Sequence, residues 1–340
     1  MMGTMENDTL VTVRNLKIFI YTDNRCNKAV NDVSLSIRKG KTLCVVGESG
    51  CGKSITASSI MRLLPELGRI EEGEIIYHGE KKEIRIDQLE PKGRVMRSLR
   101  GSQLSMVFQD PMTALNPVYT IGFQIMESLL YHMTLTRPEM RKRTLALLKD
   151  MGVPIPEQRM YEYPHQLSGG MRQRAMIAMA MACDPKVLIA DEPTTALDVT
   201  IQAQVFDLMK ELQRKHNTAI MLITHDMGVV AEMADDVVVM YMGNIVEKGT
   251  VDEVFRTPRH PYTVNLLRSI PVLGRGRDQK LNPIRGSTPD PYDRPKGCQF
   301  APRCDYATAV CQEKMPPEEV VDTTHLVRCW NHGKVSSNGR

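Results

Sequence analysis

The feature that most constrains the fold is a glycine-rich segment that lies between a short apolar run and a helix-like run. The apolar run, Thr42–Val46, has the composition of a buried strand, and residues 55–64 have a helical pattern. The segment between them matches GxxxxGK[ST] and consists of Gly47, Glu48, Ser49, Gly50, Cys51, Gly52, Lys53 and Ser54. A strand, such a loop and a helix in this order cradle phosphate groups. The sequence therefore predicts an α/β fold that binds nucleotide phosphates.

Each part of this loop has a physical role. Glycines let the backbone curl, so that successive N–H groups and the helix N-terminus point at the phosphates. Lys53 adds a point charge, and the Ser54 hydroxyl can ligate Mg²⁺. Cys51 lies at a variable position of the pattern, where we expect a tolerated small side chain and not a redox-sensitive thiol.

Two further apolar runs end in polar side chains that suit hydrolysis. Residues 187–190 lead into Asp191 and Glu192, and residues 219–224 lead into His225. Because the carboxyl ends of parallel strands meet at one edge of a sheet, we expect these groups near the phosphates. Asp191 is then placed to hold Mg²⁺, Glu192 to polarise the attacking water, and His225 to contact the terminal phosphate.

A second anion-binding segment, Leu167-Ser168-Gly169-Gly170, opens a long amphipathic run and places a serine and two glycines at a helix N-terminus. Together with the phosphate loop, Gln109, the two carboxylates and His225, this order of motifs resembles the ATP-binding subunit of an ATP-binding cassette (ABC) transporter. The motifs span residues 40–230.

The resemblance assigns further residues. It implies that Ser168, Gly169 and Gly170 close over the ATP of a facing subunit in a head-to-tail dimer. It also implies that Gln109 senses Mg²⁺ and couples to the membrane partner, and that Ala196, Leu197 and Asp198 form the loop that crosses the dimer. An aromatic residue upstream of the loop stacks on adenine in this family, and Tyr21 is the candidate here.

The predicted architecture is a mixed α/β ABC-type core with an insertion and a tail. Residues 1–258 form the nucleotide-binding domain, with an antiparallel β region from the N-terminus and residues 74–107. Periodic apolar residues predict a helical subdomain at about residues 110–170. Residues 259–340, the C-terminal extension, follow.

Four of the eight cysteines lie in this extension: Cys298, Cys304, Cys311 and Cys329. Their grouping favours a metal site, and the spacing leaves zinc and an iron–sulfur cluster open, although zinc usually shows closer pairs. His325 is a possible spare ligand, but a solvated histidine is the simpler interpretation. The segments around His260 and Cys298 resemble the oligopeptide, dipeptide and nickel importer branch, which implies a [4Fe-4S] cluster of structural role.

Charge and hydropathy limit the kinds of partner that we expect. The net charge of +4 comes from 44 basic and 40 acidic residues without basic blocks, so nucleic acid is not expected. Neither a signal peptide nor an apolar run of about 18 residues is present. We therefore expect a peripheral protein on the cytoplasmic face of the membrane.

The sequence thus predicts an ATPase that powers peptide import. Its expected partners are a second, related but different ATPase chain, two transmembrane permease subunits and, indirectly, an extracytoplasmic substrate-binding protein. An importer of nickel or another small solute is an alternative within the same branch. A soluble ABC protein that acts on DNA or ribosomes is the alternative from another class, but such proteins carry two cassettes or a long coiled coil, and this chain has one cassette without sustained heptads.

Overall fold

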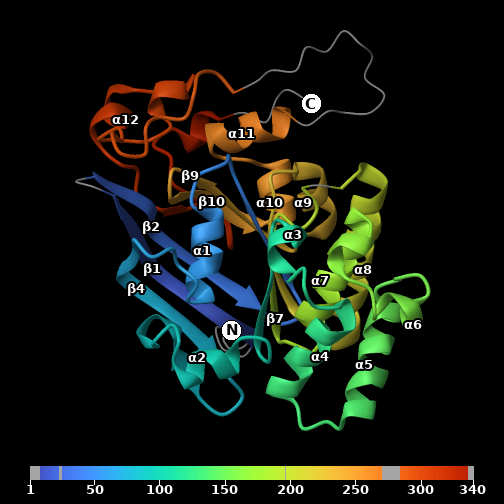
Figure 1. Cartoon of the computed structure of the whole chain (residues 1–340). Coiled ribbons are helices and arrows are strands. Elements are labelled where there is room, and N and C mark those ends of the chain that lie inside the picture. The colour runs from blue at the N-terminus through green and yellow to red at the C-terminus, as the bar shows by residue number, and fades with distance from the viewer. Residues whose placement is uncertain (1–7, 23–24, 196, 270–283, 336–340) are drawn as a thin grey trace. The chain divides into compact units, whose positions relative to one another are not determined.

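The fold is built from two units, and each combines segments that are far apart in the sequence (Figure 1). The computed structural model describes residues 8–22, 25–195, 197–269 and 284–335. The first unit comprises residues 1–10, 37–41 and 78–222, and the second comprises residues 11–36, 42–77 and 223–340.

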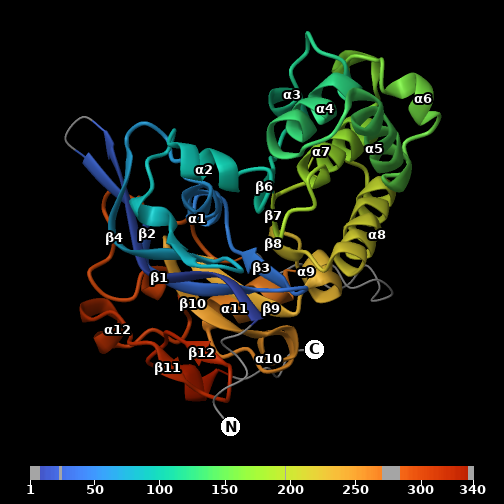
Figure 2. The same cartoon turned by 90° about the horizontal axis from the view of Figure 1, so that it is seen from below.

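An antiparallel sheet forms one layer of the second unit. Three of its four strands are β1 (Thr9–Thr22), β2 (Arg25–Arg38) and β4 (Gly68–His78), and β1 lies between β2 and β4 (Figure 2). Val11 pairs with Tyr77, and Val11 and Val13 are both buried. Alternation of buried and exposed side chains is typical of a sheet with one face on a core. The N-terminal antiparallel region predicted from the sequence is thus present.

The phosphate loop follows a strand of another sheet in this unit. There β3 (Thr42–Val46) pairs in parallel with β9 (Asp236–Tyr241), which turns back through β10 (Asn244–Thr250). Every residue of β3 is buried, as expected of a central strand. Two short strands of the C-terminal extension, β12 (Leu326–Val327) and β11 (Glu319–Val320), continue the sheet beyond β10.

Short helices complete the second unit. They are α1 (Lys53–Ile60), α9 (Met227–Met233), α10 (Val251–Arg256), α11 (Pro261–Arg268), α12 (Ala309–Glu313) and the 3₁₀ turns Ala301–Arg303 and His332–Lys334. Of these, α11, α12 and both turns belong to the C-terminal extension.

The first unit contains the strand that ends in the two carboxylates. Strand β7 (Val187–Asp191) lies between β8 (Ala219–Ile223) and β6 (Leu104–Val107), and β6 and β7 are parallel. The prediction that residues 74–107 all belong to the antiparallel region was therefore wrong for Leu104–Val107. A run of four residues carries no signal for the direction of its partner, so only the fold decides it. Strand β5 (Glu83–Arg85), a turn at Ile86–Gln88 and α2 (Arg94–Leu99) precede β6.

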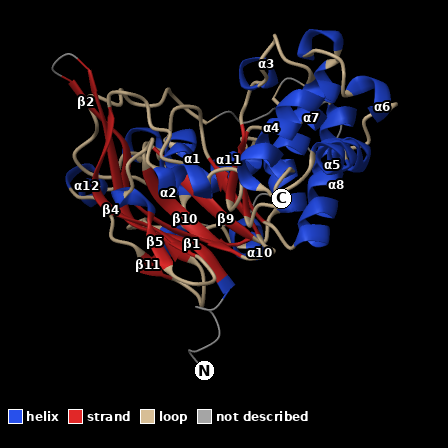
Figure 3. Cartoon of the chain, turned by 60° about the horizontal axis from the view of Figure 1, so that its bottom comes forward, coloured by secondary structure: helices blue, strands red, loops and turns tan. Residues whose placement is uncertain are grey.

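Helices dominate the rest of the first unit, as the apolar periodicity predicts (Figure 3). They are α3 (Pro111–Ala114), α4 (Ile121–His132), α5 (Arg137–Asp150), α6 (Pro156–Arg159), the turn Pro164–Gln166, α7 (Gly169–Met181) and α8 (Val199–His216). Helices α4, α5 and α7 pack on one another through buried residues such as Leu129, Leu148 and Ile177. None of the helices in the described ranges has the length and hydropathy that crossing a bilayer requires.

Candidate functional site

The phosphate loop adopts a curl that only glycine can supply at its key positions. Gly47 has φ 149° and Gly52 has φ 105°. A Cβ on Gly47 would lie 2.2 Å from the Met240 carbonyl oxygen, and one on Gly52 would lie 2.3 Å from the Ala29 carbonyl oxygen. Both clashes are with backbone, which cannot move aside as a flexible side chain would. The loop is therefore fixed by its close approach to neighbouring strands.

The loop lysine points back over the loop. Lys53 is buried, and its Nζ donates to the carbonyl oxygens of Gly47 at 2.8 Å and Glu48 at 3.0 Å. Ser54, the next residue, is exposed at the start of α1. A buried ammonium group held by carbonyl oxygens, and by Cys51 Sγ at 3.9 Å, is a ready partner for an anion, because phosphate oxygens offer it an opposite charge.

Cys51 has no sign of reactivity in this loop. The side chain is buried, and burial raises the pKa of its thiol. A protonated, inaccessible thiol is a poor nucleophile. This agrees with the interpretation of Cys51 as a small residue tolerated inside the loop.

The first unit brings Gln109 and Glu192 together. Gln109 follows β6 and Glu192 follows β7, so the parallel pairing of the two strands carries both residues to the same edge. Gln109 Nε2 donates to Glu192 Oε2 at 3.0 Å, and Thr195 Oγ1 donates to the same oxygen at 3.1 Å. Asp191, at the end of β7, is buried. Sequence reasoning missed Thr195, whose only signal was its place three residues after Glu192.

Glu192 has a strained backbone. Its φ is 44°, in the left-handed region that a non-glycine residue rarely adopts. Residues held in this way concentrate at functional sites, because the surrounding structure must over-determine them. Here two side-chain donors fix the carboxylate while the backbone turns sharply away from β7.

The second glycine-rich segment and the following loop lie side by side in the first unit. Ser168 caps α7, with Oγ accepting from Met171 N at 3.4 Å. A Cβ on Gly170 would lie 2.9 Å from Ile201 Cγ2, which places the start of α7 against the start of α8. Asp198 caps α8 by accepting from Ile201 N at 3.0 Å. Ala196, assigned to the same loop, lies outside the described residues.

His225 and Tyr21 belong to strands and loops of the second unit. His225 is exposed and precedes Asp226, the N-cap of α9. Tyr21 lies on β1, is 40% exposed, and donates its hydroxyl to Glu71 at 2.8 Å. The Arg69 guanidinium lies 5.8 Å from the centre of its ring. The Tyr21 ring is thus accessible for stacking but already has a cationic neighbour.

Nitrogen donors surround the cysteines of the C-terminal extension. Asn331 N donates to Cys329 Sγ at 3.4 Å, and Asn331 Nδ2 lies 3.5 Å from Cys311 Sγ. Cys304 Sγ accepts from Tyr306 N at 3.4 Å. N–H donors to sulfur stabilise thiolates and are typical of iron–sulfur sites.

The surroundings also shift the pKa values of two of these thiols upward. Burial raises the pKa of Cys304 to about 11 and that of Cys329 to about 12, and electrostatic interaction with Cys298 and Cys311 adds to both shifts. In the part of the chain that the structure describes, no three His, Cys, Asp or Glu side chains are grouped so that they could hold a metal ion. Electrostatic interactions thus link Cys298, Cys304, Cys311 and Cys329, but the described side chains are not grouped in the way a metal site requires.

His325 is not the solvated residue that the sequence suggested. It is 2% exposed, and its Nε2 lies 2.7 Å from Oε1 of the fully buried Glu247 on β10. The backbone N–H groups of Arg259 and His260 donate to the same carboxylate at 2.6 and 3.0 Å. A buried carboxylate needs such partners, and this requirement recruits the histidine.

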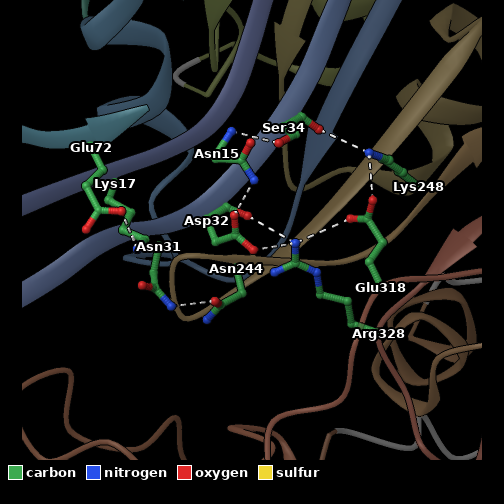
Figure 4. A network of polar contacts seen from close by, with 10 residues as sticks. All are labelled: Asn15, Lys17, Asn31, Asp32, Ser34, Glu72, Asn244, Lys248, Glu318 and Arg328. Atoms are coloured by element: carbon green, nitrogen blue, oxygen red, sulfur yellow. Dashed lines mark hydrogen bonds and ion pairs between the residues drawn. The ribbon is translucent and has the colours of Figure 1, made fainter. Parts of the chain in front are cut away.

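A network of charged side chains also joins the C-terminal extension to the β1–β2 layer (Figure 4). The Arg328 guanidinium lies between Asp32 Oδ2, at 2.8 Å, and Glu318 Oε2, at 3.4 Å. Glu318 also pairs with Lys248 on β10 at 3.4 Å, and Asn15 donates to Asp32 Oδ1 at 2.9 Å. The extension is thus held by charge pairs as well as by strand pairing.

Two family profiles match the chain. The family described as "ABC transporter" matches residues 30–195, which include the phosphate loop, Gln109 and the two carboxylates. The family described as "Oligopeptide/dipeptide transporter, C-terminal region" matches residues 246–311.

Curated relatives are similar over nearly their whole length. A probable peptide ABC transporter ATP-binding protein of Sinorhizobium fredii is 46% identical over 98% of both chains. The dipeptide transport ATP-binding protein of Bacillus subtilis is 47% identical over 95% of both chains. An oligopeptide transport ATP-binding protein of the same organism is 51% identical over 95% of this chain and 96% of its own.

Solved structures of ATP-binding cassettes have a similar fold. A dimeric ATP-binding cassette in a post-hydrolysis state, bound to ADP and Pi, is 26% identical with a TM-score of 0.63, and the match covers 71% of this chain and 99% of that one. A cassette from Clostridium perfringens that is part of an ABC transporter complex is 28% identical with a TM-score of 0.61, covering 76% of this chain and 95% of its own.

Proposed function

Because the chain belongs to the ATP-binding subunits of ABC transporters, we propose that it powers the import of di- or oligopeptides through a membrane permease. The match to the ABC transporter family and the similarity to a cassette in a post-hydrolysis state support ATP hydrolysis. The observation that carries the peptide substrate is the match of residues 246–311 to the C-terminal region of oligopeptide and dipeptide transporters, together with the names of the curated relatives.

The phosphate loop supplies the binding energy for the nucleotide. Lys53 exchanges its two carbonyl partners for phosphate oxygens, and loop N–H groups other than that of Glu48 donate to the same phosphates. Ser54 in the second unit, and Asp191 and Gln109 in the first, each carry a side-chain oxygen that would suit Mg²⁺, and the ion would neutralise charge on the phosphates when bound. Tyr21 stacks on the adenine, supported by its accessible ring.

Glu192 acts as the general base. Its carboxylate is held by Gln109 and Thr195, so the oxygen that accepts the proton of the attacking water is fixed before the reaction begins. His225, exposed after β8, contacts the terminal phosphate. The hydrogen bond from Gln109 to Glu192 also links the base to the segment that, in this family, reads the membrane partner.

A second ATPase subunit completes the enzyme. The start of α7, with the exposed N-cap Ser168 and the half-buried Gly169 and Gly170, faces the nucleotide of the partner, and Asp198 crosses the dimer. We expect the partner to be a related but different chain. The pair works at the cytoplasmic face with two permease subunits, and an extracytoplasmic binding protein delivers the peptide.

The experiment that tests this mechanism is the substitution Glu192→Gln. The variant should bind ATP as the wild type does, accumulate a closed dimer and lose hydrolysis by about 10²-fold or more. Asp207→Asn, a carboxylate on the exposed face of α8, is the matched control and should hydrolyse normally. Rapid turnover by the Glu192→Gln variant would remove Glu192 from the role of base.

The finer proposal for the extension is a structural [4Fe-4S] cluster on Cys298, Cys304, Cys311 and Cys329, with zinc as the competing metal. Its support is the number of thiols and the N–H donors around Cys304, Cys311 and Cys329. Metal and sulfide analysis of anaerobically purified protein decides between them. About four irons and four sulfides per chain, lost in Cys304→Ser, support the cluster; one zinc or no metal contradicts it.

A further inference from the structure

The second residue of the phosphate loop is held from the C-terminal extension. Arg303 Nη1 donates to Glu48 Oε2 at 2.7 Å, and Arg303 Nη2 donates to Glu48 Oε1 at 3.0 Å. Thr288 Oγ1 donates to Oε2 at 3.0 Å as well. This is a two-pronged guanidinium–carboxylate pair, the geometry that fixes orientation as well as distance. The two partners are 255 positions apart in the sequence.

The backbone of the same residue is held by the extension too. Glu48 N donates to the hydroxyl of Tyr262 at 2.8 Å, and Tyr262 is fully buried on α11. This N–H is therefore committed to the protein and not to a phosphate. Glu48 is thus fixed at its side chain and at its main chain by residues outside the loop.

Arg303 is itself rigidly placed. Its side chain is 5% exposed, and its guanidinium carbon lies 5.9 Å from the ring centres of both Tyr241 and Phe300. Its Nε donates to the carbonyl oxygen of Arg285 at 2.9 Å. The two neighbouring rings and the hydrogen bond from Nε hold the guanidinium in its orientation toward Glu48.

The charges of the pair support one another. Burial raises the pKa of Glu48, but the hydrogen bonds and charge of Arg303 outweigh it and hold that pKa below its usual range. Glu48 is therefore ionised at neutral pH, and the pair keeps its full attraction there. Burial of one partner without the other would leave an uncompensated charge.

We propose that Arg303 is a positioning residue for ATP binding, which holds the phosphate loop in its binding-competent curl through Glu48. The inference rests on the proposed function. A loop that is ordered before the nucleotide arrives loses less conformational entropy on binding, so affinity rises without any new contact to the ligand. In this role Arg303 acts through Glu48, to which its guanidinium donates twice, and needs no contact of its own with the nucleotide.

The test is equilibrium binding of Mg·ATP to the full chain. Arg303→Gln should weaken the affinity by about fivefold or more, the lower end of typical coupling between sites. Arg303→Lys, which keeps the charge but not the two-pronged geometry, should recover part of the loss. The matched control is Arg285→Gln, an exposed arginine of the same extension that pairs with Asp305 at the surface, and it should bind as the wild type does.

Two further measurements separate positioning from a general loss of structure. Glu48→Gln removes the pair from the other side, and the double variant with Arg303→Gln should bind no more weakly than Arg303→Gln alone, because both changes remove one interaction. In ATPase assays of the assembled transporter, KM should rise while kcat stays nearly unchanged. Strictly additive losses, or a fall in kcat with KM unchanged, would overturn the inference.

The outcomes also separate this inference from the proposed function. If the wild type fails to bind Mg·ATP, the proposed function is wrong. If the wild type binds and both Arg303→Gln and Glu48→Gln bind equally well, only the positioning role is wrong. If Arg303→Gln does not fold, the result for Glu48→Gln decides, since the isosteric amide leaves Arg303 in place.

Discussion

Replacing Glu247 with glutamine should destabilise the second unit, because the substitution leaves a buried donor without an acceptor. Both carboxylate oxygens of Glu247 accept a backbone N–H, from Arg259 and from His260, and Oε1 also contacts His325. A carboxamide has one oxygen, so in either orientation its NH₂ group faces one of the two N–H groups. A buried, unsatisfied donor costs about 1–3 kcal/mol, and hydrogen bonds to charged groups lie at the upper end.

The expected loss is therefore about 2 kcal/mol of unfolding free energy. With a urea m-value of about 3 kcal/mol/M, the midpoint should fall by about 0.7 M. The protein contains one tryptophan, Trp330, which lies in the C-terminal extension and donates to the Lys314 carbonyl oxygen at 3.1 Å. Its fluorescence reports this region directly. Glu313→Gln, an exposed glutamate of α12, is the control of equal charge change. Equal urea midpoints for Glu247→Gln and Glu313→Gln would show that the buried donor in Glu247→Gln carries no such cost.

Two other predictions concern the same extension. Burial raises the pKa of Asp32, but the hydrogen bond from Asn15 and the charge and hydrogen bond of Arg328 outweigh burial and hold this pKa below its ordinary value. The ionised Asp32 therefore contributes to stability at neutral pH, and this contribution is lost as the pH falls through the lowered pKa. The stability difference between the wild type and Asp32→Asn should thus be constant above about pH 5 and shrink below about pH 4, as urea titrations across this range will measure. A difference that grows toward low pH would contradict this. Gly297→Ala places a Cβ 2.3 Å from the Cys311 carbonyl oxygen, whereas Gly333→Ala points into open space. Maleimide labelling of Cys311 should accelerate in the first variant and not in the second; equal rates would remove the role of Gly297.

The sequence predicts features that depend on neighbouring residues. The phosphate loop could be located because its glycines, Lys53 and the flanking strand and helix are contiguous. The strand that ends at Asp191 could be predicted for the same reason. In each case a few adjacent side chains carry the whole signal, so no knowledge of the rest of the chain is required.

Long-range partners could not be predicted in this way. The residues near Glu48 give no sign that an arginine 255 positions later pairs with it. The residues near His325 likewise do not indicate that it contacts the buried carboxylate of Glu247. The parallel pairing of Leu104–Val107 with β7 was missed for the same reason. These features are set by which segments the fold brings together, and a single sequence gives no signal for such pairs.

Arg303 connects the phosphate loop to the cysteine region of the C-terminal extension. It lies in the 3₁₀ turn Ala301–Arg303, between Cys298 and Cys304, and so any constraint on those two sulfurs also constrains the turn that carries the guanidinium. Cys298 N donates to the Cys311 carbonyl oxygen at 2.7 Å, which ties the same turn to the next cysteine. Because Glu48 binds Arg303 by two hydrogen bonds, a displacement of the turn cannot leave the phosphate loop unaffected. On the proposal that Arg303 positions the phosphate loop, this coupling is reciprocal: whatever orders the cysteine region and favours the Glu48–Arg303 pair should raise ATP affinity, and ATP should stabilise the cysteine region by the same factor.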